Sequence, residues 1–230
     1  MDETRGFTPA LGFHLLTPLY DRVVAVTTRE RTFKGALLDQ AVIEPGQQVL
    51  DVGCGTGTLA IAAQRRKQGV CVAGLDADPT VLAIATRKAR EAGVDIAFDL
   101  GRSSALPYPD ERFDRVLSSL FFHHLSCGDK LLTARQMHRV LRPAGELHVA
   151  DWGRAGGLAS RIAFLAIQLL DGFDTTSDNV AGLLPVVFAS AGFRHVEETR
   201  RIPTVFGVVS LYRAVKGGAS SEQHPAGSTA

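Results

Sequence analysis

A glycine-rich turn between an apolar run and a helix-forming run constrains the fold of this chain most strongly. Residues 48–52 predict a short buried strand, and residues 58–65 are strong helix formers. Between them, Gly53, Gly55 and Gly57 allow a tight turn where a ligand can lie against bare main chain. The segment therefore predicts a strand, loop and helix unit with a ligand at the loop.

The same alternation of strand and helix continues along the chain. Helices are predicted between residues 18 and 43 (one or two), at 79–92 and at 129–141, and strands at 70–75, 95–98, 113–119 and 146–150. Asp78 is expected to cap the helix that begins at Pro79. Strands that are apolar on both faces are typical of a parallel sheet covered on both sides by helices.

The last third of the chain departs from this alternation. Helices are expected near residues 158–170 and 179–191, and they are followed by strands at 193–198 and 204–215. About five residues connect these two strands, and a parallel crossover needs a dozen or more. The α/β sheet is therefore expected to end in an antiparallel hairpin.

Length and composition favour one domain. We expect a single domain over residues 1–216, with an N-terminal helical cap at 1–43 and a helical insert at 152–191 over the cleft, followed by a disordered Gly- and Ser-rich tail at 217–230. The 25 Lys and Arg nearly balance the 24 Asp and Glu, which disfavours nucleic acid as a partner. No signal peptide or membrane span is expected, so the predicted location is cytoplasmic.

The cysteines indicate neither a disulfide framework nor a metal site. The three thiols at Cys54, Cys71 and Cys127 include no C-x-x-C pair, and no other ligand cluster is evident.

The glycine spacing narrows the class of ligand. A dinucleotide fingerprint would need glycine where Thr58 stands, and no Gly-Lys-Ser/Thr follows, as a phosphate loop requires. Asp51 disfavours a pyrophosphate and suits a ligand with an ammonium group. Asp76, at the end of the second strand, is placed to accept both ribose hydroxyls of a nucleoside. The alternative is an ordinary glycine-rich turn.

These residues resemble the class I S-adenosylmethionine-dependent methyltransferases, in the group with quinone-biosynthesis C-methyltransferases. The resemblance rests on VLDVGCGTG, GLDADP, the segment 105–125 and LRPAGELHVADWG, and spans roughly residues 15–213. It implies a Rossmann-like three-layer sandwich with a seven-stranded sheet, and S-adenosylmethionine as cofactor with S-adenosylhomocysteine as product. The cofactor-binding positions it implies are Asp51, Gly53, Cys54, Gly55, Thr56, Gly57, Asp76, Ala77, Arg102, Ser103, Ser119 and Tyr20.

Within that set, Asp51 and the glycine loop are expected to hold the methionine moiety, Asp76 the ribose and Ala77 the adenine. Tyr20 is expected either to reach the cofactor carboxylate or to pack its helix down. The chain departs from the family at Arg102, where an adenine-contacting Asp is common. Arginine has no acceptor lone pair, so Ser103 or a main-chain carbonyl is left to accept from the adenine, with the guanidinium stacked on a ring.

Methyl transfer from a sulfonium needs alignment and only sometimes a base. Candidate catalytic residues follow the fourth and fifth strands: His123, His124 and Asp151. Either imidazole is able to remove a proton near neutral pH or to satisfy backbone groups, and Asp151 is able to orient a substrate or to cap the strand. Trp152 is expected to flank an aromatic acceptor or to close the core.

The expected activity is methyl transfer to a small, aromatic or apolar acceptor. The alternative is a protein that binds S-adenosylmethionine without transferring a methyl group, since one fold supports many chemistries. The sequence leaves open whether carbon, oxygen or nitrogen is methylated, and whether the protein is a monomer or a homodimer.

Overall fold

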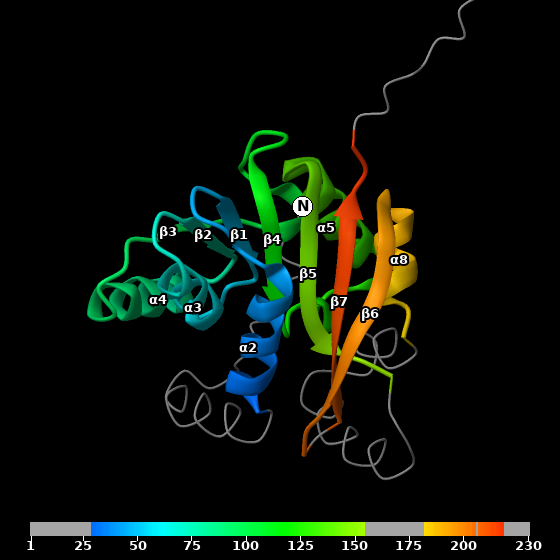
Figure 1. Ribbon diagram of the computed structural model, residues 1–230, viewed down its shortest axis with the longest axis horizontal. Helices are drawn as coiled ribbons and strands as arrows, with labels where there is room; N and C mark the ends of the chain where they lie inside the picture. The colour runs from blue at the N-terminus through cyan, green and yellow to red at the C-terminus, as the bar shows by residue number, and fades with distance from the viewer. Residues whose placement is uncertain (1–28, 155–181, 206, 219–230) are drawn as a thin grey trace, which may run out of the picture.

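The structure is a computed structural model that describes residues 29–154, 182–205 and 207–218 (Figure 1). The helix expected near 158–170, most of the N-terminal cap and most of the tail lie outside these residues.

A seven-stranded sheet, in the order β3-β2-β1-β4-β5-β7-β6, forms the centre of the molecule (Figure 1). The five strands from β3 to β5 are parallel, and β7 runs antiparallel to both of its neighbours. The predicted hairpin and fold class are therefore confirmed. The strands are β1 (Gln48–Val52), β2 (Cys71–Asp76), β3 (Ala97–Leu100), β4 (Phe113–Ser119), β5 (Leu141–Trp152), β6 (Phe193–Pro203) and β7 (Val208–Lys216).

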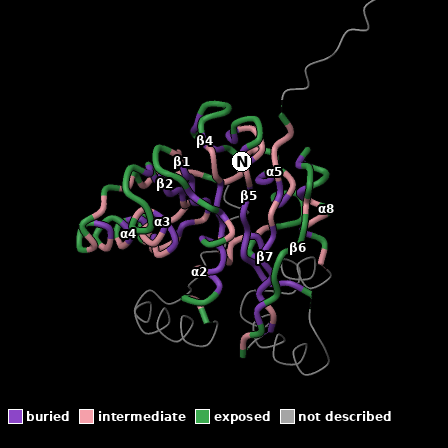
Figure 2. The backbone as a smooth tube through the Cα atoms, viewed as in Figure 1, coloured by how far each residue is buried: buried purple, intermediate pink, exposed green. Residues whose placement is uncertain are grey.

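Helices cover both faces of this sheet. The described α-helices are α2 (Glu30–Ala41), α3 (Thr58–Arg66), α4 (Pro79–Glu91), α5 (Cys127–Val140) and α8 (Leu184–Ser190), with 3-10 turns at η1 (Ser103–Ala105) and η2 (Phe122–His124). Apolar side chains of α2 and α3 share one buried cluster with the strands, and those of α5 and α8 share another. Figure 2 shows the buried segments concentrated along the central strands.

The local signals place most elements as expected. The fourth strand matches its prediction, and the Asp78 carboxylate caps α4 by accepting from the Thr80 N–H at 2.7 Å. The third strand starts two residues later than predicted. The fifth begins earlier, at Leu141, because Leu141 pairs with Phe113, and residues 142–145 bulge out of the ladder with Ala144 at a φ of 61°.

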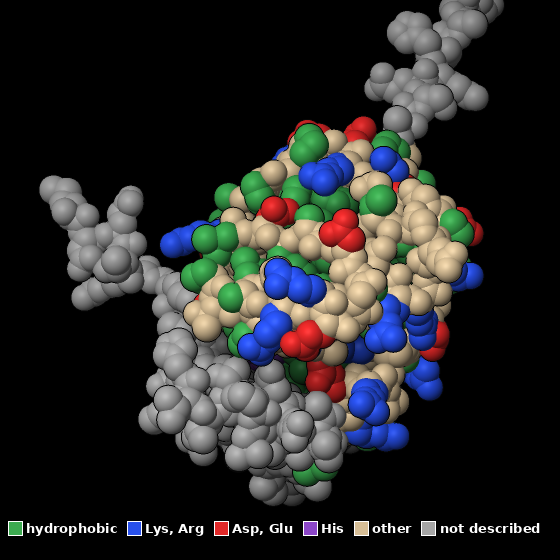
Figure 3. Space-filling view, turned by 90° about the vertical axis from the view of Figure 1, so that its left-hand side faces the viewer, with side chains coloured by type: hydrophobic (Ala, Val, Ile, Leu, Met, Phe, Trp, Pro, Cys, Tyr) green, Lys and Arg blue, Asp and Glu red, His purple; other side chains and the backbone are tan. Residues whose placement is uncertain are grey.

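The strand order reverses between β1 and β4, and loops from both strands meet there. In open α/β sheets, ligands bind at this switch point, beyond the carboxyl ends of the strands. Figure 3 shows basic and acidic side chains interspersed on the face that carries the β3 edge, in keeping with the net charge of +1. Within the described segments no helix is long and apolar enough to cross a membrane.

Candidate active site

The glycine loop after β1 is a tight turn that is hydrogen-bonded to the end of the neighbouring strand, β2. Gly53, Gly55 and Gly57 have φ values of 70°, 51° and 75°, a region that favours glycine. The N–H groups of Gly53 and Cys54 both donate to the Leu75 carbonyl, at 2.9 and 3.0 Å. The loop is thereby fixed against the end of β2.

A lysine on α4 forms hydrogen bonds with the end of the same loop and the start of α3. The Lys88 ammonium donates to the hydroxyls of Thr56 and Thr58, at 3.0 and 2.9 Å. The Cys54 thiol inside the loop is buried, and burial raises its pKa. A thiol held neutral in this way is not a nucleophile.

Asp51, at the end of β1, is a buried carboxylate whose two oxygens have no hydrogen-bond partner within the part of the chain that the structure describes. Burial, reinforced by Asp76, raises its pKa to about 7, while Lys34 and the main chain at Ala60 work in the opposite direction. An unsatisfied buried carboxylate is costly. The arrangement favours a ligand that brings a cation or N–H donors to this point.

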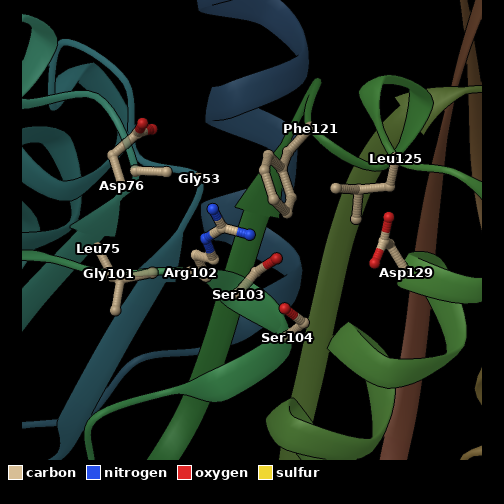
Figure 4. Close-up of a pocket in the computed structure, with 11 residues that line it drawn as sticks. Gly53, Leu75, Asp76, Gly101, Arg102, Ser103, Ser104, Phe121, Leu125 and Asp129 are labelled. Carbon is tan, nitrogen blue, oxygen red and sulfur yellow. The ribbon is translucent and has the colours of Figure 1, made fainter. Parts of the chain in front are cut away.

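Asp76, at the end of β2, lines a cavity that we call the β2 cavity. Burial raises the pKa of Asp76, against the opposing effect of the N–H donors of Gly55, Asp78 and Ala77. The cavity is also lined by Gly53, Ala77, Gly101, Arg102, Ser103 and Phe121 (Figure 4). The structure thus brings together the residues predicted to hold the ribose and adenine.

At the end of the β2 cavity where the adenine is predicted, the hydrogen-bond acceptors differ from those expected from the sequence. The Ser103 hydroxyl, proposed as an acceptor for the adenine, already forms a 2.8 Å hydrogen bond with the Thr133 hydroxyl. Arg102 is exposed and lines the cavity, together with Asp129 from the first turn of α5. Asp129 is an acceptor at this end of the cavity that sequence reasoning missed.

A second cavity, the α2 cavity, meets the first at Gly53. It is lined by the glycine loop, by Ser119 and Leu120 after β4, and by side chains of three helices, among them Arg31, Lys34, Leu38, Ala62 and Lys88. Four cations and the acid Glu30 therefore line a space that begins at the glycine loop directly after Asp51. The Asp51 carboxylate would bind the ammonium group of an amino-acid ligand, and the nearby cations would bind its carboxylate.

Comparison with known proteins agrees with this geometry. Residues 49–145 match the family described as a methyltransferase domain. A demethylmenaquinone methyltransferase from Thermus thermophilus is 32% identical over 158 residues, which cover 66% of this chain and 71% of that protein. The chain belongs to the class I S-adenosylmethionine-dependent methyltransferases.

Two further similarities show how much of other methyltransferases this chain matches. Methyltransferase GfsG from Streptomyces halstedii is 36% identical over 143 residues, 61% of this chain and 49% of that protein, so the match spans about half of its length. A solved S-adenosylmethionine-dependent methyltransferase from Aquifex aeolicus has a TM-score of 0.61 at 20% identity, over 80% of this chain and 89% of that one. The second likeness shows the fold.

The residues present fit the cofactor of the family, S-adenosylmethionine. The carboxylate of Asp51, which has no hydrogen-bond partner among the described residues, suits the methionine ammonium, and the bare main chain at Gly55, with no atom within 4 Å of an added Cβ, leaves room for the ligand. Asp76 lines the β2 cavity, where the ribose is predicted to lie. When bound, the cofactor supplies a methyl group already activated by its sulfonium, so the protein has to align the acceptor and exclude water.

The candidate catalytic residues of this methyltransferase do not line either described cavity. His123 is buried, with its Nδ1 2.9 Å from the Asp151 carboxylate, which is itself fully buried. His124 is exposed and its ring centroid lies 3.9 Å from that of His123. Trp152 is buried in the core cluster of α2 and α3, which supports the second of its two expected roles. Catalysis by the histidines or Asp151 stays a prediction.

Two other expectations concern Tyr20 and a metal site. Tyr20 lies outside the described residues. No group of three or more potential metal ligands occurs in the described part of the chain.

Sequence reasoning missed Lys34 and Lys88, which line the α2 cavity. One signal was present: Lys88 is three residues after Ala85, on the apolar face of a predicted helix, where a cation needs a partner. For Lys34 the decisive information is its position across the fold.

Proposed function

We propose that this methyltransferase transfers a methyl group from S-adenosylmethionine to a small aromatic acceptor of the phenol or quinol class. The observation that carries the proposal is the α2 cavity, which combines apolar and cationic walls beside the proposed methionine site. The similarity to a demethylmenaquinone methyltransferase supports the same class of acceptor.

The apolar part of the cavity suits a flat ring. Leu38 is buried, and Leu120 and Ala62 are partly buried side chains that pack against the same core cluster. Contact with an aromatic ring would remove apolar area from water, at about 25 cal/mol per Å².

The cationic part of the cavity suits an acceptor that reacts as an anion. Lys34 forms an ion pair with Glu30, whereas Arg31 has no ion-pair or hydrogen-bond partner among the described residues. A guanidinium next to a phenol or quinol favours its deprotonated, more nucleophilic form. The acceptor would then be activated without a dedicated general base.

Acceptor assays with isotopically labelled methyl groups test this proposal. Purified protein is incubated with methyl-labelled S-adenosylmethionine and either a water-soluble 1,4-naphthoquinol with a free ring position, a simple phenol, or phosphoethanolamine. We expect labelled product from the naphthoquinol or the phenol. Transfer to phosphoethanolamine alone would contradict the proposed acceptor class.

A matched pair of arginine variants tests the role of the cationic wall. Arg31→Met should lower kcat/KM for the acceptor about tenfold and leave the Kd for S-adenosylhomocysteine within about twofold, consistent with loss of one charged contact. Arg29→Met, at an exposed position that lines neither described cavity, is the control. Equal kcat/KM in the two variants would remove Arg31 from the proposal.

A further inference from the structure

The carboxylate of Asp151, near the end of β5, holds the main chain that follows β4. Its Oδ2 accepts from the N–H groups of Phe121 at 2.9 Å and Phe122 at 2.7 Å. Its Oδ1 accepts from the Trp152 N–H at 2.8 Å and lies 2.9 Å from His123 Nδ1. Although burial acts to raise it, the pKa of Asp151 lies below its ordinary value because His123 and the Trp152 N–H stabilise the ionised form.

The segment held in this way begins with a strained residue. Leu120 has a φ of 50°, a region that non-glycine side chains rarely adopt. Its N–H donates to the Ala150 carbonyl at 2.8 Å, and the next two N–H groups are those that Asp151 binds. Strain of this kind persists only where the surroundings fix the backbone. The end of β5 therefore determines the shape of the turn after β4.

That turn directs the Phe121 ring into the β2 cavity. Figure 4 shows the ring between Gly53 and Leu125, facing the centre of the cavity. A Cβ atom added to Gly53 would lie 2.2 Å from Phe121 Cδ2, so the ring rests directly on the bare main chain of the glycine loop. The ring therefore forms the wall at the point where the two cavities meet.

We propose that Asp151 is a positioning residue for cofactor binding, which acts by holding the main chain at Phe121 and Phe122 and so the Phe121 ring against Gly53. His123 takes part through its contact with the Asp151 carboxylate. The inference rests on the proposed function only in that S-adenosylmethionine binds along the glycine loop, where the two cavities meet. It assigns Asp151 a role different from direct action on the acceptor.

Asp151→Asn tests the proposal, because asparagine keeps the shape of the side chain but loses the charge and one acceptor oxygen. Calorimetry with S-adenosylhomocysteine, at a temperature where the variant is fully folded by circular dichroism, should show an increase in Kd of about tenfold. An unchanged Kd in the folded variant would overturn the proposal.

Asp114→Asn is the matched control. The Asp114 carboxylate also accepts a main-chain N–H, that of Gln48 at 2.7 Å, and also contacts a cation, Arg142 at 2.7 Å. It lies near the start of β4, at the opposite end of the strand from the turn. We expect a Kd close to wild type; a tenfold increase here as well would show a general effect of weakening the sheet and would overturn the specific role of Asp151.

A double-mutant cycle with Phe121→Ala identifies the route of the effect. If Asp151 acts through the Phe121 ring, the double variant binds S-adenosylhomocysteine no more weakly than the weaker single variant. Additive losses would overturn the proposed route. Phe121→Ala alone should also weaken binding.

Two His123 variants carry the test if Asp151→Asn does not fold. His123→Asn keeps a side-chain N–H for Asp151, and His123→Leu does not. We expect only the leucine variant to raise the Kd, and equal affinities would overturn the proposal. Absence of binding by the wild-type protein would instead refute the cofactor site itself, so the two failures are distinguishable.

Discussion

The carboxylate of Asp76 accepts a hydrogen bond from the N–H of Gly55 at 2.8 Å, across the gap between β2 and the glycine loop. Its other oxygen accepts from the Asp78 N–H at 3.1 Å. The acid proposed to bind the ribose thus also fixes the loop proposed to bind the methionine moiety. One side chain would then position both the ribose and the loop around the methionine moiety of a bound cofactor.

Asp76→Ala should therefore weaken cofactor binding strongly. The variant loses two charge-assisted hydrogen bonds to the ribose, each of about 1.5–3 kcal/mol, so the Kd for S-adenosylhomocysteine should rise at least about a hundredfold. Calorimetry measures it. In the control Asp78→Ala only the cap of α4 is lost, which should cost about 1 kcal/mol of stability and leave the Kd unchanged. An unaltered Kd in Asp76→Ala would place the ribose elsewhere.

The raised pKa of Asp51 predicts that stability depends on pH. In the unfolded chain this group titrates near pH 4, whereas in the folded protein burial raises its pKa to about 7. Between these values the folded protein keeps a proton that the unfolded chain has released. The free energy of unfolding should therefore fall as pH rises from about 4 to about 7, by a few kcal/mol.

Urea denaturation of the ligand-free protein from about pH 5 to pH 8 measures this dependence. Asp51→Asn cannot ionise and should lose that part of the slope. An identical slope in both proteins would show that Asp51 keeps an ordinary pKa.

Lys88 is expected to support cofactor affinity through the glycine loop. Lys88→Met removes the hydrogen bonds to Thr56 and Thr58 and should raise the Kd for S-adenosylhomocysteine about tenfold. Arg87→Met is the control, since Arg87 is exposed and pairs only loosely, at 3.8 Å, with Glu91. If both variants bind with equal affinity, the lysine does not hold the loop.

Two Gly-to-Ala variants should change stability in opposite directions. At Gly53 a φ of 70° and the Phe121 ring leave no room for a Cβ, so Gly53→Ala should lower both the free energy of unfolding and cofactor affinity. At Gly128, in α5, no atom lies within 4 Å of the added Cβ. Gly128→Ala should stabilise the protein by up to about 1 kcal/mol in urea denaturation. A stabilising Gly53→Ala would contradict the packing described above.

Local signals in the sequence were sufficient for the order of elements along the chain, and the resemblance to a family supplied the cofactor. The strand at 113–119 and the cap at Asp78 each follow from neighbouring residues and were predicted. The short link before the last strand was predicted at about 199–203, whereas β6 extends to Pro203 and β7 begins at Val208. The beginning of β5 was not predicted, because pairing with β4 extends it through the bulge at Ala144. That pairing joins residues distant in sequence.

The sequence by itself determined the parallel sheet, the glycine loop after β1 and the two acids, Asp51 and Asp76, since each depends on residue type and spacing within a few positions. Only the tertiary structure decided what surrounds them. Lys88, on α4, donates a hydrogen bond to Thr56 in the glycine loop, and Asp151, on β5, accepts one from Phe121 in the turn after β4. Such contacts depend on how separate elements pack, and packing brings together side chains that no local pattern connects.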